Sequence, residues 1–175
     1  RYRDLVLALH RPPRADAVLR HLAECTGHTA YLARFVDGRL VIADVAEGPR
    51  SPYLEDLQVG LEAAAHATAL GKALLRALPA AQRRRQLAGL ELRPFTPHTP
   101  TEPADVEAEL RRFGPGGLVV EHGQFRADVS CASAVVPCRS GDERWAVGVS
   151  SRGHELPGTL LSHLRLAITD LAPAH

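Results

Sequence analysis

The chain has 175 residues, and its 21 Lys or Arg side chains almost balance its 20 Asp or Glu side chains, which leaves a formal net charge of +1. With 45% hydrophobic and 23% charged residues, the composition is that of a globular domain, and it excludes a disordered tail, a collagen-like repeat and a disulfide-rich mini-protein. No apolar run approaches the ~18 residues that a membrane span requires. The near-neutral charge gives no electrostatic footprint for nucleic acid, so we expect any DNA contact to lie outside this chain.

Length and residue usage also indicate what kind of protein segment this is. Residues 1–175 contain no internal repeat and no long linker, so we expect a single domain. The chain has no methionine, and we therefore expect that a segment upstream of position 1 has been removed. Three cysteines without CxxC spacing favour a reducing, cytoplasmic compartment, and nine scattered histidines without HxxxH or HExxH spacing predict no metal site.

The first part of the chain predicts a helix followed by a β-hairpin. Apolar residues recur at helical spacing over 12–27, where a proline pair suits the first turn and a glycine ends the run. β-forming residues occupy 28–36 and 39–46, on either side of the turn signal Asp37-Gly38.

The middle of the chain carries its most informative helix. Glycine and proline predict a loop over 47–52, and a short strand is expected over 53–60. Residues 66–78 predict a helix that is interrupted only by a glycine, with Thr68 as its N-cap or first-turn residue. Lys72, the only lysine of the chain, lies on this helix, where a surface salt bridge is the default expectation.

The next helix is expected over 79–87 and contains three consecutive arginines at 83–85. Adjacent helical positions point about 100° apart, so this triplet fans around the helix and favours a solvated surface over an anion-binding face.

The remaining elements complete an alternating pattern of helices and strands. A proline-broken loop over 95–101 leads to Thr101, which we expect to cap a helix with an apolar stripe, and Gly114 ends that helix. Strands are expected over 118–121, 130–138 and 145–151, with a turn at 140–142 and a final amphipathic helix over 157–172. Hairpins combined with end helices predict an α+β fold with a mainly antiparallel sheet flanked by helices.

Four motifs in chain order carry a family resemblance that runs from about Leu5 to Leu171. They are LAECTG at 22–27, HATALGKALL at 66–75 after Gly60, the loop at 95–99, and CASAVVP at 131–137 followed by WAVGVSS at 145–151. In this combination the chain resembles the effector-binding domain of IclR-type bacterial transcriptional regulators. The resemblance implies a GAF-like (profilin-like) domain that binds a small metabolite, typically a small organic acid or an aromatic compound. It also implies a winged helix-turn-helix domain upstream, which reads DNA, and assembly into a homodimer or a dimer of dimers.

The resemblance and the residues together suggest where an effector binds. The start of the helix at Thr68, Ala69 and Leu70 offers unpaired N–H groups and the positive end of a helix dipole to a carboxylate, although small residues there also suit close helix packing. On the two long strands, side chains alternate, so further candidates share one face of the sheet: Cys131, Ser133, Gly148 and Ser150. Gly148 stands where the family often has serine, and we expect it to enlarge the cavity. Alternatively, these polar groups are satisfied by the backbone of a buried sheet.

An acidic candidate and an apolar wall complete the predicted site. Glu121 is the first candidate for the acidic residue and Asp128 the second, in a segment that is longer than the family usually has. A carboxylate beside an acidic ligand is repulsive unless one of them is protonated, which favours a hydroxyl, amine or amide on the effector, or else a surface role for Glu121. Leu54 and Leu57 are expected in an apolar wall or in the core, on a segment that could close over the pocket.

Two alternative functions remain open at the level of sequence. Cys131 with His122 and Asp128 could form a nucleophile, base and orienting acid, but a cysteine inside an apolar strand has a raised thiol pKa, so we expect no enzyme. The other alternative is a GAF-like sensory module with a different output partner.

Overall fold

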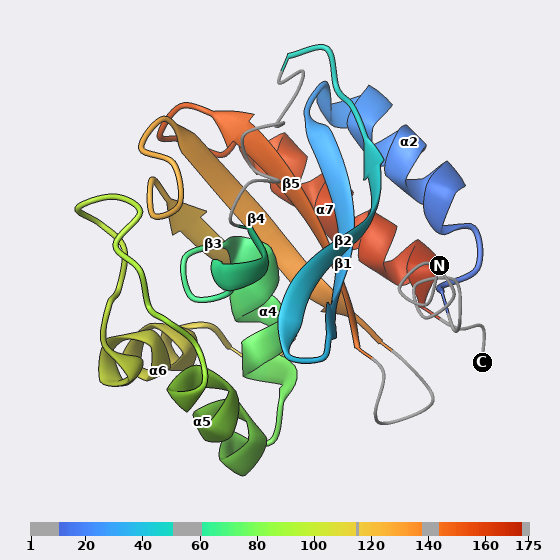
Figure 1. Cartoon of the computed structure of the whole chain (residues 1–175). Coiled ribbons are helices and arrows are strands. Elements are labelled where there is room, and N and C mark those ends of the chain that lie inside the picture. The colour runs from blue at the N-terminus through green and yellow to red at the C-terminus, as the bar shows by residue number, and fades with distance from the viewer. Residues whose placement is uncertain (1–10, 51–60, 115, 138–143, 173–175) are drawn as a thin grey trace.

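One antiparallel sheet organises the molecule (Figure 1). The computed structural model describes residues 11–50, 61–114, 116–137 and 144–172. The sheet has five strands in the order β2-β1-β5-β4-β3, and every neighbouring pair is antiparallel. Their bounds are β1 Thr29–Val36, β2 Arg39–Ala46, β3 Val119–His122, β4 Val129–Val136 and β5 Trp145–Arg152. The α+β prediction and five of the predicted strands are thus confirmed, while the strand expected over 53–60 and the turn at 140–142 lie outside the described residues.

Helices cover both faces of the sheet (Figure 1). One face carries α2 (Ala15–Thr26) and α7 (Gly158–Leu171), and the other carries α4 (Ala69–Ala77) with the short 3-10 helix η1 (Leu61–Ala63). The helices α5 (Ala80–Ala88) and α6 (Pro103–Arg112) lie beyond α4, at one end of the molecule. Among the described residues, no helix has both the length and the apolar character that a membrane crossing requires.

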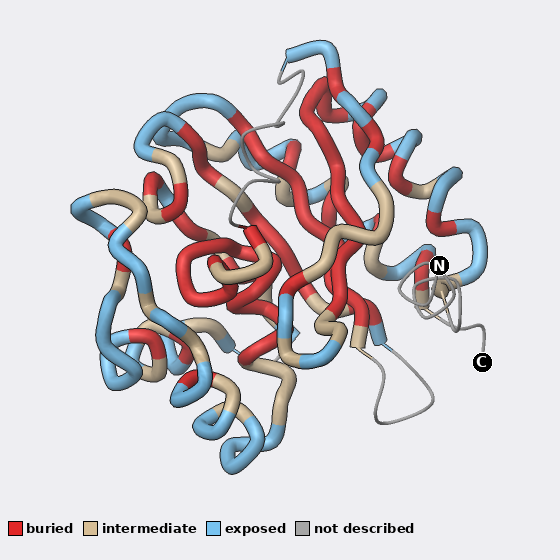
Figure 2. The backbone as a smooth tube through the Cα atoms, viewed as in Figure 1, coloured by how far each residue is buried: buried red, intermediate tan, exposed pale blue. Residues whose placement is uncertain are grey.

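Alternation along the strands gives the sheet two cores. Leu32, Trp145 and Val147 point towards α2 and α7, whereas Ala33 and Ala146 point towards α4. The central strands β1, β4 and β5 are accordingly buried along most of their length (Figure 2). Burial on both faces explains why 131–136 and 145–151 are continuous apolar runs with small polar residues in place of charges.

The start of α4 is fixed by its cap. Thr68 is the N-cap, as predicted, and its hydroxyl accepts a hydrogen bond from the backbone N–H of Gly71 at 3.2 Å. The helix begins at Ala69, three residues later than the apolar pattern suggests, because 64–67 form turns closed by backbone hydrogen bonds. Gly71 packs so closely on Ala65 that a side chain at this position would overlap the backbone of Ala65.

Two predictions about polar side chains, one at the start of α6 and one on α4, are wrong. Thr101 does not cap α6, because the N-cap position is Glu102, without a side-chain hydrogen bond, and a proline starts the first turn. Lys72 is not a surface residue: its side chain is 0% exposed, and its ammonium nitrogen lies 2.7 Å from Glu109 Oε1. A surface salt bridge was the statistical default, and the sequence offers no sign that α6 covers this lysine.

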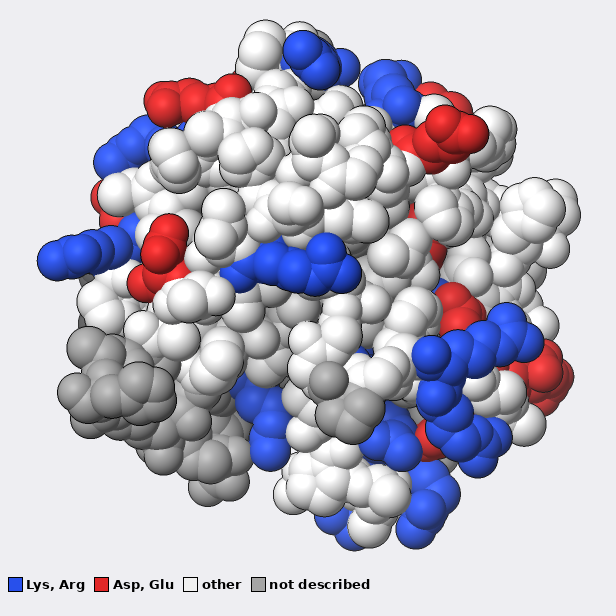
Figure 3. All heavy atoms as spheres, turned by 180° about the vertical axis from the view of Figure 1, so that it is seen from behind, with Lys and Arg blue, Asp and Glu red and all other residues white. Residues whose placement is uncertain are grey.

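The arginine triplet behaves as its helical spacing predicts. Arg84 and Arg85 are exposed on α5, while Arg83 turns towards α6 and pairs with Glu107 at 2.8 Å. Seen from behind, basic and acidic side chains gather together at the end of the molecule that carries α5 and α6 (Figure 3). The three side chains therefore do not form one anion-binding face.

Candidate functional site

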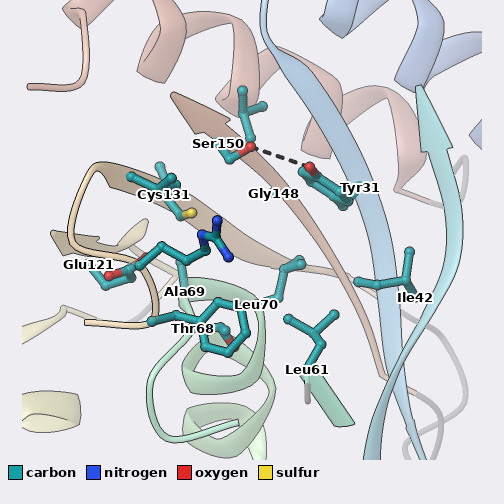
Figure 4. A pocket seen from close by; sticks show the side chains of 15 residues that line it. Tyr31, Ile42, Leu61, Thr68, Ala69, Leu70, Glu121, Cys131, Gly148 and Ser150 are labelled. Carbon is teal, nitrogen blue, oxygen red and sulfur yellow. Dashed lines mark hydrogen bonds between the residues drawn. The ribbon is translucent and has the colours of Figure 1, made fainter. Parts of the chain in front are cut away.

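A small cavity lies between the N-terminus of α4 and the face of the sheet beneath it (Figure 4). Its free volume is about 30 Å³. Its lining comes from all five strands, η1, the start of α4 and the loop between β3 and β4: Tyr31, Ile42, Leu61, Thr68, Ala69, Leu70, Glu121, Phe125, Arg126, Val129, Cys131, Ala132, Gly148, Val149 and Ser150.

Strand register explains why residues distant in sequence meet here. Glu121 lies opposite Cys131, which in turn lies opposite Ser150, so three strands contribute one row across the sheet. In the next row Gly148 on β5 lies opposite Tyr31 on the neighbouring strand β1. The hydroxyl of Ser150 donates to the Tyr31 hydroxyl at 3.4 Å, and burial raises the pKa of Tyr31 far above its ordinary value. The prediction that Cys131 and Ser150 lie on the same face of the sheet is therefore confirmed.

Ser133 belongs to the same face but does not line the cavity. It is fully buried, and its hydroxyl donates to the backbone carbonyl of Val147 at 2.8 Å. For this residue the structure matches the alternative that a buried sheet satisfies its own polar groups.

The three residues predicted at the start of α4 all line the cavity. The first backbone hydrogen bond of the helix runs from Lys72 N–H to the Thr68 carbonyl, so the N–H groups of Ala69 and Leu70 come before it. Thr68 uses its hydroxyl on the N–H of Gly71, so the N–H groups of Ala69 and Leu70 are the two that precede every hydrogen bond of the helix start. Together with the helix dipole they favour an anion at this position.

Gly148 does not enlarge the cavity, contrary to the prediction. A Cβ atom added at Gly148 would lie 3.0 Å from Leu70 Cδ2 and 3.1 Å from the carbonyl oxygen of Ala132. The space that the missing side chain leaves is therefore occupied by the Leu70 side chain, which reaches down from α4.

Glu121 is buried in the wall of the cavity, so the surface role considered for it is wrong. The residue is 2% exposed, and its carboxyl accepts a hydrogen bond from the backbone N–H of Gln124 at 2.9 Å. Burial raises the pKa of Glu121 to about 7, although the hydrogen bonds from Gln124 and from the Cys131 thiol and the charge of Lys72 oppose the rise. The charge of nearby Glu109 adds to the rise. At neutral pH this carboxyl is thus protonated in a substantial fraction of molecules.

Behind Glu121 lies a buried polar cluster that connects α4, α6 and the loop after β3. Lys72 donates to Glu109 and to the side-chain oxygen of Gln124, and the amide nitrogen of Gln124 also donates to Glu109 at 3.2 Å. Desolvation lowers the pKa of Lys72, while Glu109 opposes that change. Since the backbone of Gln124 holds Glu121, this cluster, consisting of Lys72, Glu109 and Gln124, positions the acid of the cavity.

Comparison with known proteins assigns a family to this fold and cavity. The family model "Bacterial transcriptional regulator IclR C-terminal" matches residues 11–173 of the chain. The chain belongs to the IclR family. A probable transcriptional regulator, SauR, from Cupriavidus necator is 38% identical over 103 residues, which is 56% of this chain and 40% of SauR. The HTH-type transcriptional regulator BhcR from Paracoccus denitrificans is 28% identical over 163 residues, covering 91% of this chain and 57% of BhcR. The chain thus matches about half the length of these relatives.

A solved structure confirms the fold expected of an IclR effector-binding domain. A double mutant of the PobR inducer-binding domain from Acinetobacter, in complex with 3-hydroxybenzoic acid, superposes with a TM-score of 0.78 at 21% identity. The match covers 93% of this chain and 97% of that one. The GAF-like α+β architecture is therefore that of IclR C-terminal domains.

Several lining residues of this IclR domain were missed at the sequence level, namely Tyr31, Ile42, Leu61, Phe125 and Arg126. A signal existed for Tyr31, because period-2 alternation places it with Ala33 and Phe35 on one face of its strand. Arg126 and Phe125 lie in the long segment after β3, whose loop conformation has no pattern in the sequence. Phe125 is held by Phe95, with ring centroids 4.8 Å apart.

Other predicted site residues lie elsewhere. Asp128 is exposed and pairs with Arg152 at 3.1 Å, away from the cavity lining. His122 is exposed and contacts Ser130 through Nδ1 at 3.0 Å, so it does not join Cys131 and Asp128 in a catalytic arrangement. Leu54 and Leu57, with the segment considered as a moving lid, lie outside the described residues.

Replacing Glu121 by glutamine should change how the stability of this domain depends on pH. Because the folded-state pKa of about 7 lies above the ordinary 4.5, the folded chain binds more protons than the unfolded chain between these values. The stability from this group is fully present below pH 4.5 and is lost as pH rises through 7. The advantage of Glu121→Gln over the parent in free energy of unfolding should therefore grow by roughly 2 to 3 kcal/mol between pH 5 and pH 8.

Urea unfolding of both proteins at the two pH values measures this difference. The comparison with the variant is necessary because buried His66 has a lowered pKa and gives the parent an opposite slope in the same range. His66 is unchanged in the variant and cancels in the difference. An advantage that is equal at both pH values would show that Glu121 titrates normally.

Proposed function

We propose that this IclR domain binds a small carboxylic acid as its effector in the cavity at the N-terminus of α4. The observation that carries the proposal is that Arg126 and the two helix-start residues Ala69 and Leu70 line one otherwise largely apolar cavity. These groups favour a carboxylate, and the apolar surface favours a short carbon skeleton over a bare inorganic anion. The PobR domain in complex with 3-hydroxybenzoic acid supports an organic acid as the ligand class.

Glu121 gives the site a second kind of contact. In its protonated form it donates a hydrogen bond, and the raised pKa makes that form available near neutral pH. A protonated acid beside a bound carboxylate removes the repulsion that two anions would have. We propose that Glu121 donates to an oxygen of the effector and that Tyr31 and Ser150 bind its other polar groups.

The site acts as a sensor and not as a catalyst in this proposal. Cys131 is half-buried in the wall of the cavity, and desolvation of its thiol, together with the Glu121 carboxyl beside it, raises its pKa well above the ordinary value. A thiol in this state has little thiolate and is a weak nucleophile. The curated relatives are transcriptional regulators, which agrees with a binding role.

The proposed output is regulation of a DNA-binding domain in the same protein. We propose that residues 1–175 form one effector-binding domain, that a winged helix-turn-helix domain precedes it, and that the regulator works in the cytoplasm as a homodimer or a dimer of dimers. The chain itself has a near-neutral charge, so it contributes sensing and assembly while DNA is bound elsewhere.

Arg126→Gln should weaken effector binding strongly. Removing one charge-assisted hydrogen bond costs about 1.5 to 3 kcal/mol, which corresponds to a 10- to 150-fold rise in Kd. The experiment screens organic acids of two to eight carbons by thermal shift, and then titrates by calorimetry the acid that stabilises the parent. A hundredfold excess over Kd adds about 2.7 kcal/mol, which for a domain of this size raises Tm by about 5 to 10 °C.

Arg84→Gln is the matched control, because Arg84 is an exposed arginine on α5, away from the cavity. It should bind the same acid with the parent's affinity. Equal affinities for Arg126→Gln and Arg84→Gln would show that the acid binds elsewhere, and no stabilisation by any acid would count against the proposed function.

A further inference from the structure

His66 is a fully buried histidine that joins the turns before α4 to the connection between α5 and α6 (Figure 1). Its Nε2 lies 3.0 Å from the backbone carbonyl oxygen of Arg93. Because a carbonyl oxygen only accepts hydrogen bonds, Nε2 carries a proton and donates it. The ring also contacts Phe95, with ring centroids 5.8 Å apart. His66 therefore holds one end of residues 93–99, which we call the 93–99 segment.

The 93–99 segment in turn holds the loop between β3 and β4. Phe95 packs edge-on against Phe125, with ring centroids 4.8 Å apart, and the Thr96 hydroxyl donates to the carbonyl of Gly123 at 2.6 Å. Phe125 lines the cavity at the start of α4, whereas the buried histidine does not. A change at the histidine can thus reach one wall of the cavity through the 93–99 segment.

The second ring nitrogen of His66 has nothing to bind. Within the described part of the chain, Nδ1 is buried and has no hydrogen-bond partner. The neutral ring tolerates this because Nδ1 then carries only a lone pair, but protonation would place an N–H and a positive charge there without an acceptor. Among the neighbouring groups, Lys72 on α4 adds a second positive charge, Phe95 is uncharged, and the guanidinium of Arg93 is exposed and pairs with Glu91.

The pKa of His66 reflects these surroundings. Burial lowers it from the ordinary 6.5, the hydrogen bond to the Arg93 carbonyl opposes the change, and the charge of Lys72 lowers it further. The buried position therefore accepts the neutral ring and rejects the charged one.

We propose that protonation of His66 releases the 93–99 segment and with it the loop between β3 and β4, so that acid loosens one wall of the cavity. The charged ring leaves its buried position for water, where it gains the hydration and the hydrogen bonds that the interior does not supply. This control by pH goes beyond the proposed function and does not depend on which molecule the cavity binds.

The sign and the limit of the effect follow from proton linkage. With a lowered pKa in the closed state, His66 binds fewer protons there than in the open state. Its stabilisation of the closed state is fully present above pH 6.5 and is lost as pH falls. Between pH 7 and pH 5 the equilibrium constant for opening should rise several-fold, and by at most about 25-fold, the limit for a ring that stays neutral while closed and has a pKa of 6.5 when open.

Amide hydrogen exchange followed by mass spectrometry tests the proposal at pH 5 and pH 7, after correction for the intrinsic pH dependence of exchange. The comparison is between the parent and His66→Gln, in which the glutamine amide keeps an N–H donor for Arg93 but does not titrate. From pH 7 to pH 5, exchange in the 93–99 segment and in residues 121–126 should accelerate several-fold more in the parent than in this variant. Glu121 titrates in the same range, but it is present in both proteins and cancels.

His98→Gln is the matched control, because His98 is exposed in the same segment. It should keep the response of the parent, and α7, on the opposite face of the sheet, should show no such acceleration in any of these proteins. His66→Asn is the second non-titrating variant, to be used if the glutamine protein is poorly folded.

Three results would overturn the proposal. The first is an equal pH response in the parent and in His66→Gln. The second is a response that α7 shares in full, because global unfolding would then explain it. The third is loss of the response in His98→Gln, which would assign it to the exposed histidine.

Discussion

Gly71→Ala should destabilise this domain by more than about 3 kcal/mol, a large part of the 5 to 15 kcal/mol that stabilises a typical domain. An added Cβ would lie 2.7 Å from the carbonyl carbon of Ala65, and still closer to its Cα and oxygen. These atoms belong to backbone in the buried turns before α4, so they cannot move aside as a flexible side chain could. Overpacking a core usually costs about 1 to 3 kcal/mol, and a clash between two backbones lies at the upper end or beyond.

The sign of this effect distinguishes it from helix propensity. In an exposed helix interior, alanine is about 1 kcal/mol more favourable than glycine. Gly158→Ala, at the open first residue of α7, is the matched control, since nothing lies within 4 Å of the added Cβ. Urea unfolding should show this variant to be as stable as the parent or slightly more so. If Gly71→Ala behaved in the same way, the close packing of α4 on the preceding turns would be disproved.

Lys72→Met should cost about 3 kcal/mol in free energy of unfolding, several times what a surface salt bridge contributes. The side chain of Lys72 is 0% exposed and that of Glu109 only 16%, so removing the ammonium leaves a largely buried carboxylate without its cation. Gln124 also loses a donor. Equilibrium unfolding in urea at pH 7 measures the loss.

A paired substitution shows whether the cost comes from the unpaired charge. Lys72→Met combined with Glu109→Leu replaces the ion pair by apolar side chains, and such replacements are often neutral or stabilising. We therefore expect the double variant to recover most of the stability that the single variant loses. A loss below about 1 kcal/mol in Lys72→Met would mean that the pair is hydrated like a surface pair.

The sequence was sufficient for the features that depend on local patterns. Period-2 alternation placed Cys131 and Ser150 on one face of the sheet, and the register confirms it. The threonine before an apolar helical run was identified as the cap of α4, and its bond to Gly71 N–H confirms it. Both properties depend on backbone geometry over a few residues, which composition and spacing encode directly.

The features that the sequence could not supply depend on contacts between distant elements. Lys72 is buried because α6 and the loop after β3 cover it, and neither is local to α4. Gly148 was expected to enlarge the cavity because a missing side chain leaves space, but a leucine from another element fills that space. Arg126 enters the cavity from a loop whose path follows from the hydrogen bonds of Gly123 and Gln124 to Thr96 and Thr99.

The burial of Lys72 also determines how this chain responds to amine chemistry. Lys72 is its only lysine, so the sequence contains a single ε-amine, and that amine is buried behind the wall of the candidate cavity. Acylating reagents and lysine-modifying enzymes can reach it only when α4, α6 and the loop after β3 separate. Modification of this one nitrogen therefore marks molecules that have opened, and a bound effector that holds the loop in place would shield it.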